Sequence, residues 1–297
     1  MALESWQYFM KHLWTNENLI CYQELTAGFP IFHINAPGQE DGAQSLPGDY
    51  EYPSMEQLAE QVQEVINTFK IVKYIGLGVG LGANVLTRHS LAYPERVESL
   101  VLVNTVITKA GWVEWGYQKR NVSHLRTTGI TQTVQEYLLW HHLGDDYNDR
   151  AHDLLQVYKD YFAHNVNPLN LAGLVEQYIW RSDIPLHRDS SSALGGLVKG
   201  TMLEAPVLNL VGIHAASEII EGTVTFNGSL EPSKANWIKV QVGAGDLTRG
   251  SQWLKYFHGV ATPAILASKE LLWAPLCHKE PEQSIAGVAT PTPHDRN

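Results

Sequence analysis

The chain has 297 residues, with 31 acidic against 21 basic side chains and a formal net charge of −10. This balance argues against binding to the phosphate backbone of nucleic acids, which requires Lys and Arg concentrated on one face. No run of about 18 apolar residues occurs, so no transmembrane helix is expected. Cys21 and Cys277 are the only cysteines, which excludes a disulfide framework or a Cys-based zinc site and favours a reducing compartment.

The first part of the chain alternates between predicted strands and helices. Short apolar runs predict strands over residues 31–35, 71–77 and 99–104. Between them, Ser54 and Gln57 have the spacing of a capping box, which predicts a helix that ends near residue 69. A second helix is predicted over 83–93. Strands joined by connections of helix length indicate a parallel sheet in an α/β domain.

The pattern changes after residue 107. Residues 131–143, 151–164 and 168–181 predict helices with no strand between them, so residues 108–200 are interpreted as a helical cap insertion. The α/β pattern resumes with a strand at 206–211, a helix near 215–229, a strand at 237–242 and a helix at about 250–258. Residues 1–107 and 201–273 would form the core, and the proline-containing tail 274–297 is expected to be disordered.

A glycine cluster, Gly76 to Gly82, separates a predicted strand from a helix. Gly78-Val-Gly80-Leu-Gly82 has the G-x-S-x-G spacing of a nucleophile elbow, with glycine in place of the nucleophile. Gly78, Gly80 and Ala83 also fit the G-x-G-x-x-G/A dinucleotide fingerprint, although the next predicted strand ends in Asn104 rather than in an acidic residue. In a third interpretation, the glycines only allow the helix to pack closely on the sheet.

Several segments resemble the N-myc downstream-regulated (Ndr) family over roughly residues 22–258. They are His33–Ala43, Tyr52–Ala59, the glycine cluster, Arg96–Asn104, Gly111–Trp115, Asn165–Leu171 and the stretch that begins at Leu230. The resemblance implies an α/β-hydrolase fold with a helical cap. It further implies a non-enzymatic, cytoplasmic protein connected with differentiation, stress response and signalling.

The three catalytic positions of an α/β hydrolase can be checked residue by residue. The nucleophile, acid and His base follow one another in that chain order. Gly80 occupies the nucleophile position, Ala215 the acid position after strand 206–211, and Asp246 the base position after strand 237–242. Because none of these residues can perform the role, the sequence predicts no catalytic residues and no enzyme. No cofactor is expected, and the expected partners are proteins, with lipid or membrane-surface contacts as an alternative.

The leading strands of the family are expected to be missing. In the usual strand order, a third strand lies between those at 31–35 and 71–77, and an unfilled position there would leave unpaired edges. Residues 15–23 could provide a substitute, or the sequence could be a truncated isoform or an incomplete gene model.

Two further functions remain open. A divergent hydrolase could recruit Ser90 or Ser217 as nucleophile, with His89, His214 or His258 as base. A dinucleotide-binding protein would use Gly78, Gly80 and Ala83. The segment from His141 to Asp153 is rich in His and Asp but lacks a clean i, i+4 ligand pair on one helix face, as in H-E-x-x-H, so no metal site is predicted there.

Overall fold

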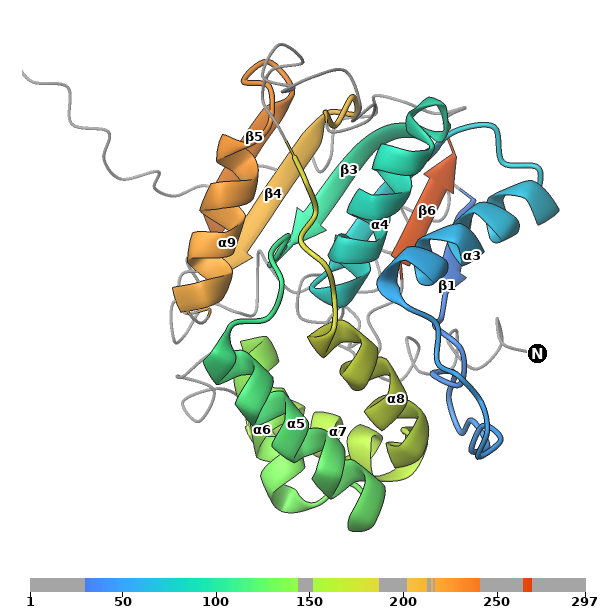
Figure 1. Cartoon of the computed structure of the whole chain (residues 1–297), viewed down its shortest axis with the longest axis vertical. Coiled ribbons are helices and arrows are strands. Elements are labelled where there is room, and N and C mark those ends of the chain that lie inside the picture. Colours follow the sequence, from blue (N-terminus) through green and yellow to red (C-terminus); the bar gives the residue numbers. More distant parts are fainter. Residues whose placement is uncertain are drawn as a thin grey trace, which may run out of the picture.

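The centre of the protein is a six-stranded sheet in the order β1-β6-β2-β3-β4-β5 (Figure 1). This computed structural model describes residues 30–143, 152–186, 202–212, 215, 217–240 and 264–268. The strands are β1 (Ile31–Ile34), β2 (Tyr74–Val79), β3 (Val97–Val103), β4 (Val207–Gly212), β5 (Ala235–Val240) and β6 (Ala264–Ser268). Strands β2, β3, β4 and β5 are parallel neighbours, which confirms the expected α/β class.

Strand β6 corrects the predicted topology. It lies between β1 and β2 and pairs antiparallel with both, with Ala267 opposite Ile31 on one side and opposite Ile75 on the other. The five predicted strands run in one direction, so the sheet is mostly parallel as expected, and the unpredicted strand β6 runs the opposite way. The position expected to be empty is filled from the C-terminal part of the chain; residues 15–23, the suggested substitute, lie outside the described residues.

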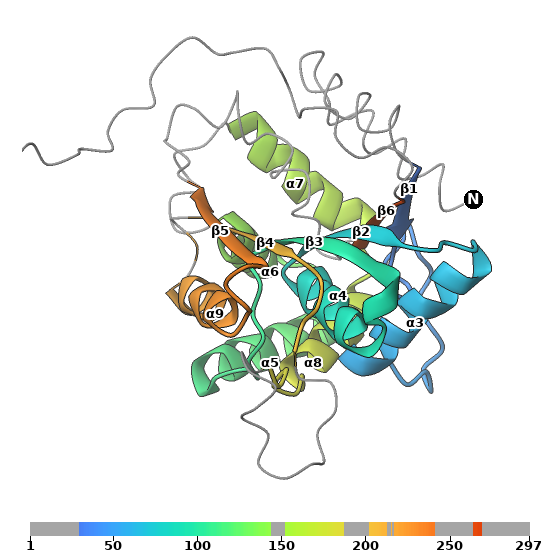
Figure 2. The same ribbon diagram turned by 90° about the horizontal axis from the view of Figure 1, so that it is seen from above.

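Three crossover helices cover one face of the sheet: α3 (Met55–Thr68), α4 (Leu81–Ala92) and α9 (Ser217–Gly228) (Figures 1 and 2). A short 3-10 helix, Pro94–Arg96, precedes β3. Helix α3 begins as predicted, because the Ser54 hydroxyl accepts from the Gln57 amide and the Gln57 side chain accepts from the Ser54 amide. Its buried positions recur at helical spacing and face α4 and the sheet: Met55, Leu58, Ala59, Val62 and Ile66.

The cap consists of α5 (Trp112–Thr127), α6 (Gln132–Leu143), α7 (His152–Asn165) and α8 (Pro168–Ile179), beyond the carboxyl ends of the parallel strands (Figure 1). Within the described parts of 108–186 there are helices and no strands. Helix α5 was not predicted, because Gly116 interrupts its apolar pattern and its buried face includes Gln118 and Asn121.

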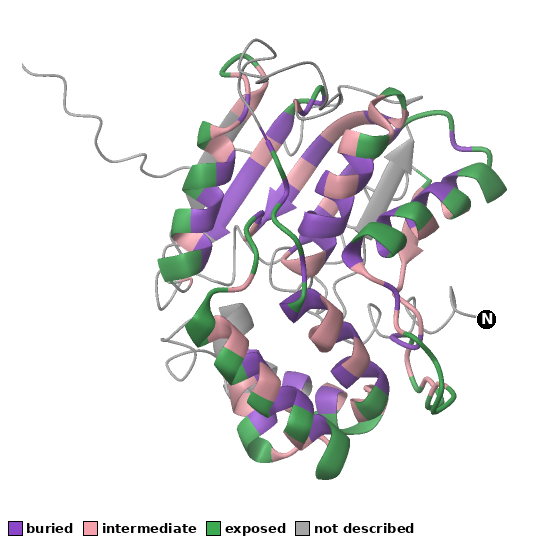
Figure 3. Cartoon of the chain, viewed as in Figure 1, coloured by how far each residue is buried: buried purple, intermediate pink, exposed green. Residues whose placement is uncertain are grey.

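Among the described residues there are three apolar clusters, and α8 contributes to the two larger ones. Of these two, the larger joins the sheet, α3 and α4 to Leu174 and Tyr178 of α8, and the smaller lies inside the cap and includes Leu171 and Ile179 of the same helix. Figure 3 shows buried segments alternating with exposed ones along the helices of both the core and the cap. None of the described helices is long and apolar enough to cross a membrane. The predicted helix at 250–258 and the tail 274–297 lie outside the described residues.

Candidate functional site

The turn between β2 and α4 has the geometry of a nucleophile elbow, with Gly80 at its apex. Gly80 has φ 53° and ψ −111°, a backbone conformation that is strained for any residue with a Cβ. Its amide donates to the Val103 carbonyl (2.9 Å), and its carbonyl accepts from Asn84 of α4 (3.1 Å). These bonds fix the turn at the carboxyl edge of the sheet, where a hydrolase presents its nucleophile.

Glycine at 78 has a steric explanation. A Cβ on Gly78 would lie 2.7 Å from the Ala83 nitrogen and 2.8 Å from the Gly82 carbonyl carbon, so a side chain there would push α4 off the strand. At Gly80, by contrast, a Cβ would meet no described atom within 4 Å. The elbow therefore has room for a nucleophilic side chain and lacks one, because glycine carries no reactive group.

The other two catalytic positions do not supply the missing groups. Ala215, the residue that the sequence places at the acid position, lies just beyond β4, and its methyl group can neither orient an imidazole nor stabilise its charged form. The neighbouring carboxylate, Glu218 on α9, accepts a hydrogen bond from Ser217 (3.3 Å). Asp246, the residue at the base position, lies outside the described residues.

His89 is engaged in a buried hydrogen-bonded chain that does not reach the elbow. Its Nδ1 is 2.7 Å from the Tyr74 hydroxyl and its Nε2 is 2.9 Å from Gln63 Oε1. Gln63 uses its amide nitrogen to donate to Asn67 (2.9 Å), so its oxygen faces the imidazole and accepts from Nε2, while Tyr74 donates to Nδ1. Burial, together with the nearby Arg96, lowers the pKa of His89 to about 4. A neutral imidazole with both nitrogens occupied cannot activate a serine.

The serines of the divergent-hydrolase alternative are also poorly placed for catalysis. Ser90 follows His89 on α4, its side chain is buried, and its hydroxyl has no hydrogen-bond partner in the described part of the protein. Ser217 is exposed at the start of α9. His214 and His258 lie outside the described residues, so that alternative is left without a described base.

The dinucleotide alternative lacks its acidic residue. Strand β3 ends at Val103 and Asn104 follows with φ 52°, so an amide occupies the place where the fingerprint uses a carboxylate for the ribose hydroxyls. Across the described residues there is no group of His, Cys, Asp and Glu that could hold a metal ion. The side chains of the His141–Asp153 segment lie outside that part.

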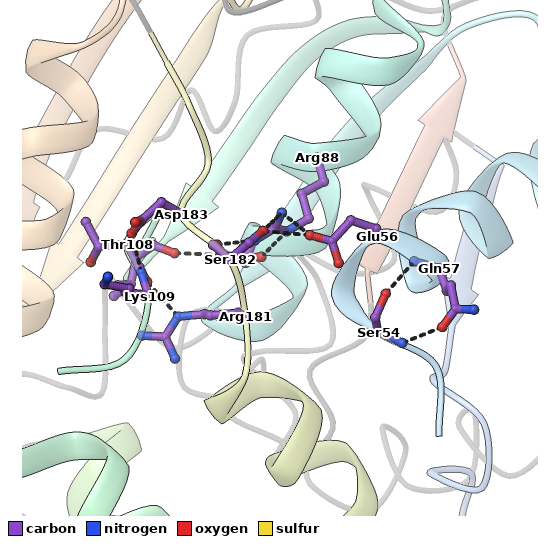
Figure 4. Close-up of polar contacts among 11 residues, drawn as sticks. Ser54, Glu56, Gln57, Arg88, Thr108, Lys109, Arg181, Ser182 and Asp183 are labelled. Carbon is purple, nitrogen blue, oxygen red and sulfur yellow. Dashed lines mark hydrogen bonds and ion pairs between the residues drawn. The ribbon is translucent and has the colours of Figure 1, made fainter. Parts of the chain in front are cut away.

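Two arginines, which the sequence reasoning did not identify, form hydrogen bonds to the two segments that connect the cap to the core (Figure 4). Arg88 of α4 donates to Glu56 of α3 (2.7 Å) and to the Ser182 carbonyl (2.6 Å) in the segment that leaves the cap. The Arg181 side chain is fully buried, donates to the Thr108 carbonyl (2.7 Å) and makes a two-bond ion pair with Glu114 (2.9 Å each). Both connections between cap and core are therefore fixed by charge-assisted bonds.

A second set of hydrogen bonds joins two of the segments that carried the family resemblance. Asn170 of α8 donates to the carbonyls of Gly38 and Gln44 (2.9 Å each) and accepts from the Leu46 amide (2.9 Å). Asn167 donates to the Ala43 carbonyl (3.1 Å). These bonds hold the loop after β1 against the cap, so both segments have a structural role here.

The fold is similar to solved α/β hydrolases. An enol-lactonase from Burkholderia xenovorans LB400 superposes with a TM-score of 0.53 at 19% identity, over 74% of this chain and 75% of that one. A hydrolase from Pseudomonas aeruginosa PA01 gives 0.52 at 18% identity, over 76% and 75%. At such low identity the likeness establishes the fold and not the activity.

The curated relatives are more similar to this chain in sequence than these two solved structures are. The protein NDRG1 of Xenopus tropicalis is 33% identical over 217 residues, 73% of this chain and 51% of the frog protein. The protein NDRG4 of the same frog is 34% identical over 223 residues, 75% and 52%. The chain thus spans about half the length of the curated relatives it matches. The Ndr family model matches residues 8–252, beginning earlier than the resemblance estimated from motifs. The helical cap and the elbow without a nucleophilic side chain agree with this match. The chain belongs to the Ndr family.

Proposed function

We propose that this is a non-catalytic protein of the Ndr type, which acts through protein or lipid contacts in cytoplasmic signalling, differentiation or stress response. The observation that carries the proposal is the elbow itself. Gly80 keeps the strained backbone of a nucleophile position and has open space before it, but carries no side chain. Hydrolysis at this site would need a nucleophile and a base, and neither is available among the described residues around it.

The fastening of the cap supports the same proposal. Many enzymes open and close a cap or lid to admit substrate and release product. Here the bonds of Arg88 to the Ser182 hydroxyl and carbonyl, and the apolar contacts of Leu174 and Tyr178 of α8 with the core, would have to break for the cap to swing away. A cap held in one position suits a scaffold whose outer surface is presented to partners.

The experiment is a combined turnover and labelling assay. Purified protein is incubated with short-chain nitrophenyl esters and, separately, with a fluorophosphonate probe that labels activated serines. We expect no turnover above buffer and no stoichiometric labelling. Robust turnover, or labelling of Ser90 or Ser217, would overturn the proposal in favour of the divergent hydrolase.

A Gly80→Ser variant sharpens the test. The new hydroxyl fits the open space, but no imidazole is described within reach to take its proton, so the variant should remain inactive. The positive φ of 53° should make it less stable than the parent by about 1–3 kcal/mol. Gly42→Ser, at a turn glycine with φ 65° and open space around it, is the matched control for backbone strain. Activity in Gly80→Ser alone would mean that a base is present after all.

A further inference from the structure

The outer side of α5 presents an unusual group of exposed aromatic and aliphatic side chains. Trp112 is 88% exposed, Val113 67% and Tyr117 59%, and Trp180, just after α8, is 62% exposed. Trp112, Val113, Tyr117, Arg120 and Trp180 are called the α5 surface below. Exposed apolar groups gathered in this way mark an interaction site more often than single ones do. Figure 3 shows exposed segments at the start of α5 and at intervals along it.

The side chains of the α5 surface lie in two adjoining rows. Val113, Tyr117 and Arg120 follow one another at i, i+4 and i+7, which places them on one side of the helix. Beside them the rings of Trp112, Trp115 and Trp180 form an edge-to-face series, with centroids 6.3 Å and 6.5 Å apart. Lys119 Nζ lies 5.4 Å from the Trp180 ring centre. The aromatic rings thus form a continuous row.

The α5 surface is rigidly supported from behind. Glu114, on the inner side of α5, holds the buried Arg181, which in turn lies 4.2 Å from the ring centre of Tyr178 of α8. Val122 and Leu125 of α5 are buried in the cap cluster. A partner that docks on a surface fixed in advance loses less conformational freedom than one that docks on a mobile loop.

The charge beside the aromatic row is positive, although the whole chain carries −10. Lys119 and Arg126 share one carboxylate, that of Glu176. Glu114 is already paired with Arg181. Among the residues that the structure describes, Arg120 has no carboxylate partner. The three cations Lys119, Arg120 and Arg126 of α5 are therefore balanced by one available carboxylate, that of Glu176. A partner that binds here gains by bringing carboxylates.

We propose that the α5 surface docks an acidic, amphipathic peptide segment of another protein. Aliphatic or aromatic side chains of the segment would cover Trp112, Val113 and Tyr117, and its carboxylates would face Arg120 and Lys119. This is a helix-face mode of recognition, with Trp and Tyr as the anchors. The inference rests on the proposed function because it names the surface through which a non-catalytic Ndr protein would act.

A peptide selection tests the proposal. A displayed library of random peptides of about 15 residues, or about four helical turns, is selected against the full chain and counter-selected against Val113→Asp. We expect enrichment of sequences that combine acidic residues with apolar residues at helical spacing. A synthetic peptide with an enriched sequence should bind Trp112→Ala and Arg120→Glu at least about tenfold more weakly than it binds the parent protein. Its affinity for the parent should decrease as the salt concentration rises. Val224→Asp, at a 48% exposed valine of α9, is the matched control and should bind normally.

Several outcomes would overturn the proposal. They are no enrichment, enrichment of basic peptides, or enriched peptides whose affinity is unchanged by Trp112→Ala and Arg120→Glu. Concentration-dependent dimers abolished by Val113→Asp would assign the surface to a second copy. Sedimentation with phosphatidylcholine or phosphatidylserine vesicles that depends on Trp112 would assign it to a membrane. Ester turnover is measured on the same samples, so a failure of the non-catalytic proposal is seen separately from a failure of the docking surface.

Discussion

The buried His89 should make the free energy of unfolding decrease at acidic pH. Burial and Arg96 hold its folded pKa near 4, below the ordinary value of 6.5. Since the unfolded chain binds a proton more readily, the free energy of unfolding has its full value above pH 6.5 and decreases as the pH falls from 6.5 towards 4. The loss expected from this residue is about 3 kcal/mol. His33, whose pKa is also lowered by burial, changes stability in the same direction.

Denaturant unfolding across this pH range measures the effect. His89→Gln should be less stable at neutral pH, because Tyr74 and Gln63 lose their partner, but its stability should depend less on pH than that of the parent. Gln156→Ala changes an exposed, non-titrating residue of α7 and should keep the parent's slope. Equal slopes for the parent and His89→Gln would mean that His89 is not buried as described.

Gly78 and Gly116 should respond in opposite ways to the same substitution. In Gly78→Ala the new methyl would lie 2.7 Å from backbone of α4, and such overpacking costs about 1–3 kcal/mol. In Gly116→Ala the methyl meets open space in the middle of an exposed helix, and the gain in helix propensity is about 0.5–1 kcal/mol. Thermal unfolding of the two variants checks this; a harmless Gly78→Ala would contradict the close packing at the elbow.

At the level of elements, sequence patterns predicted the four parallel strands because each is an apolar run bounded by turn residues. Boundaries shifted where glycines lay inside a strand. The run at 71–77 is β2 at Tyr74–Val79, so that Gly76 and Gly78 are strand residues and only Gly80 makes the turn. Strand β6 was not predicted, because it has five residues and its partners β1 and β2 lie far away in the sequence. Local pattern carries no information about such pairing.

Strand β6 should decide whether β1 stays in the sheet. Among the described strands, β1 pairs only with β6. A chain that ends after residue 262 should therefore lose amide hydrogen-exchange protection in β1, while β3 and β4 remain protected. It should also associate through the newly exposed edge of β2. A chain that ends after residue 273 keeps β6 and is the control. Undiminished protection of β1 in the shorter chain would mean that another segment completes the sheet.

Across the whole molecule, the candidate site was predictable only in part. The spacing Gly78-x-Gly80 located the elbow because an elbow is a local turn with strict steric needs. The surroundings of His89, the fastening by Arg88 and Arg181 and the exposure of Trp112 depend on contacts between residues that are distant in sequence. Arg181, for example, joins Thr108 and Glu114, and nothing in its immediate neighbours indicates that it is fully buried.

Helix α8 should make cap and core unfold as one unit. Leu174 lies in the core cluster, whereas Leu171, less than one turn away, lies in the cap cluster. Leu174→Ala removes a side chain that is 1% exposed and should cost about 2–5 kcal/mol. Because both clusters share α8, far-ultraviolet circular dichroism and tryptophan fluorescence should shift together in a single transition. Leu169→Ala, on the same helix at a 50% exposed position, should change stability by less than about 0.5 kcal/mol. If Leu174→Ala instead separated the two signals into distinct transitions, the cap would be an independent folding unit, and the apolar contacts of α8 with the sheet would not be what joins it to the core.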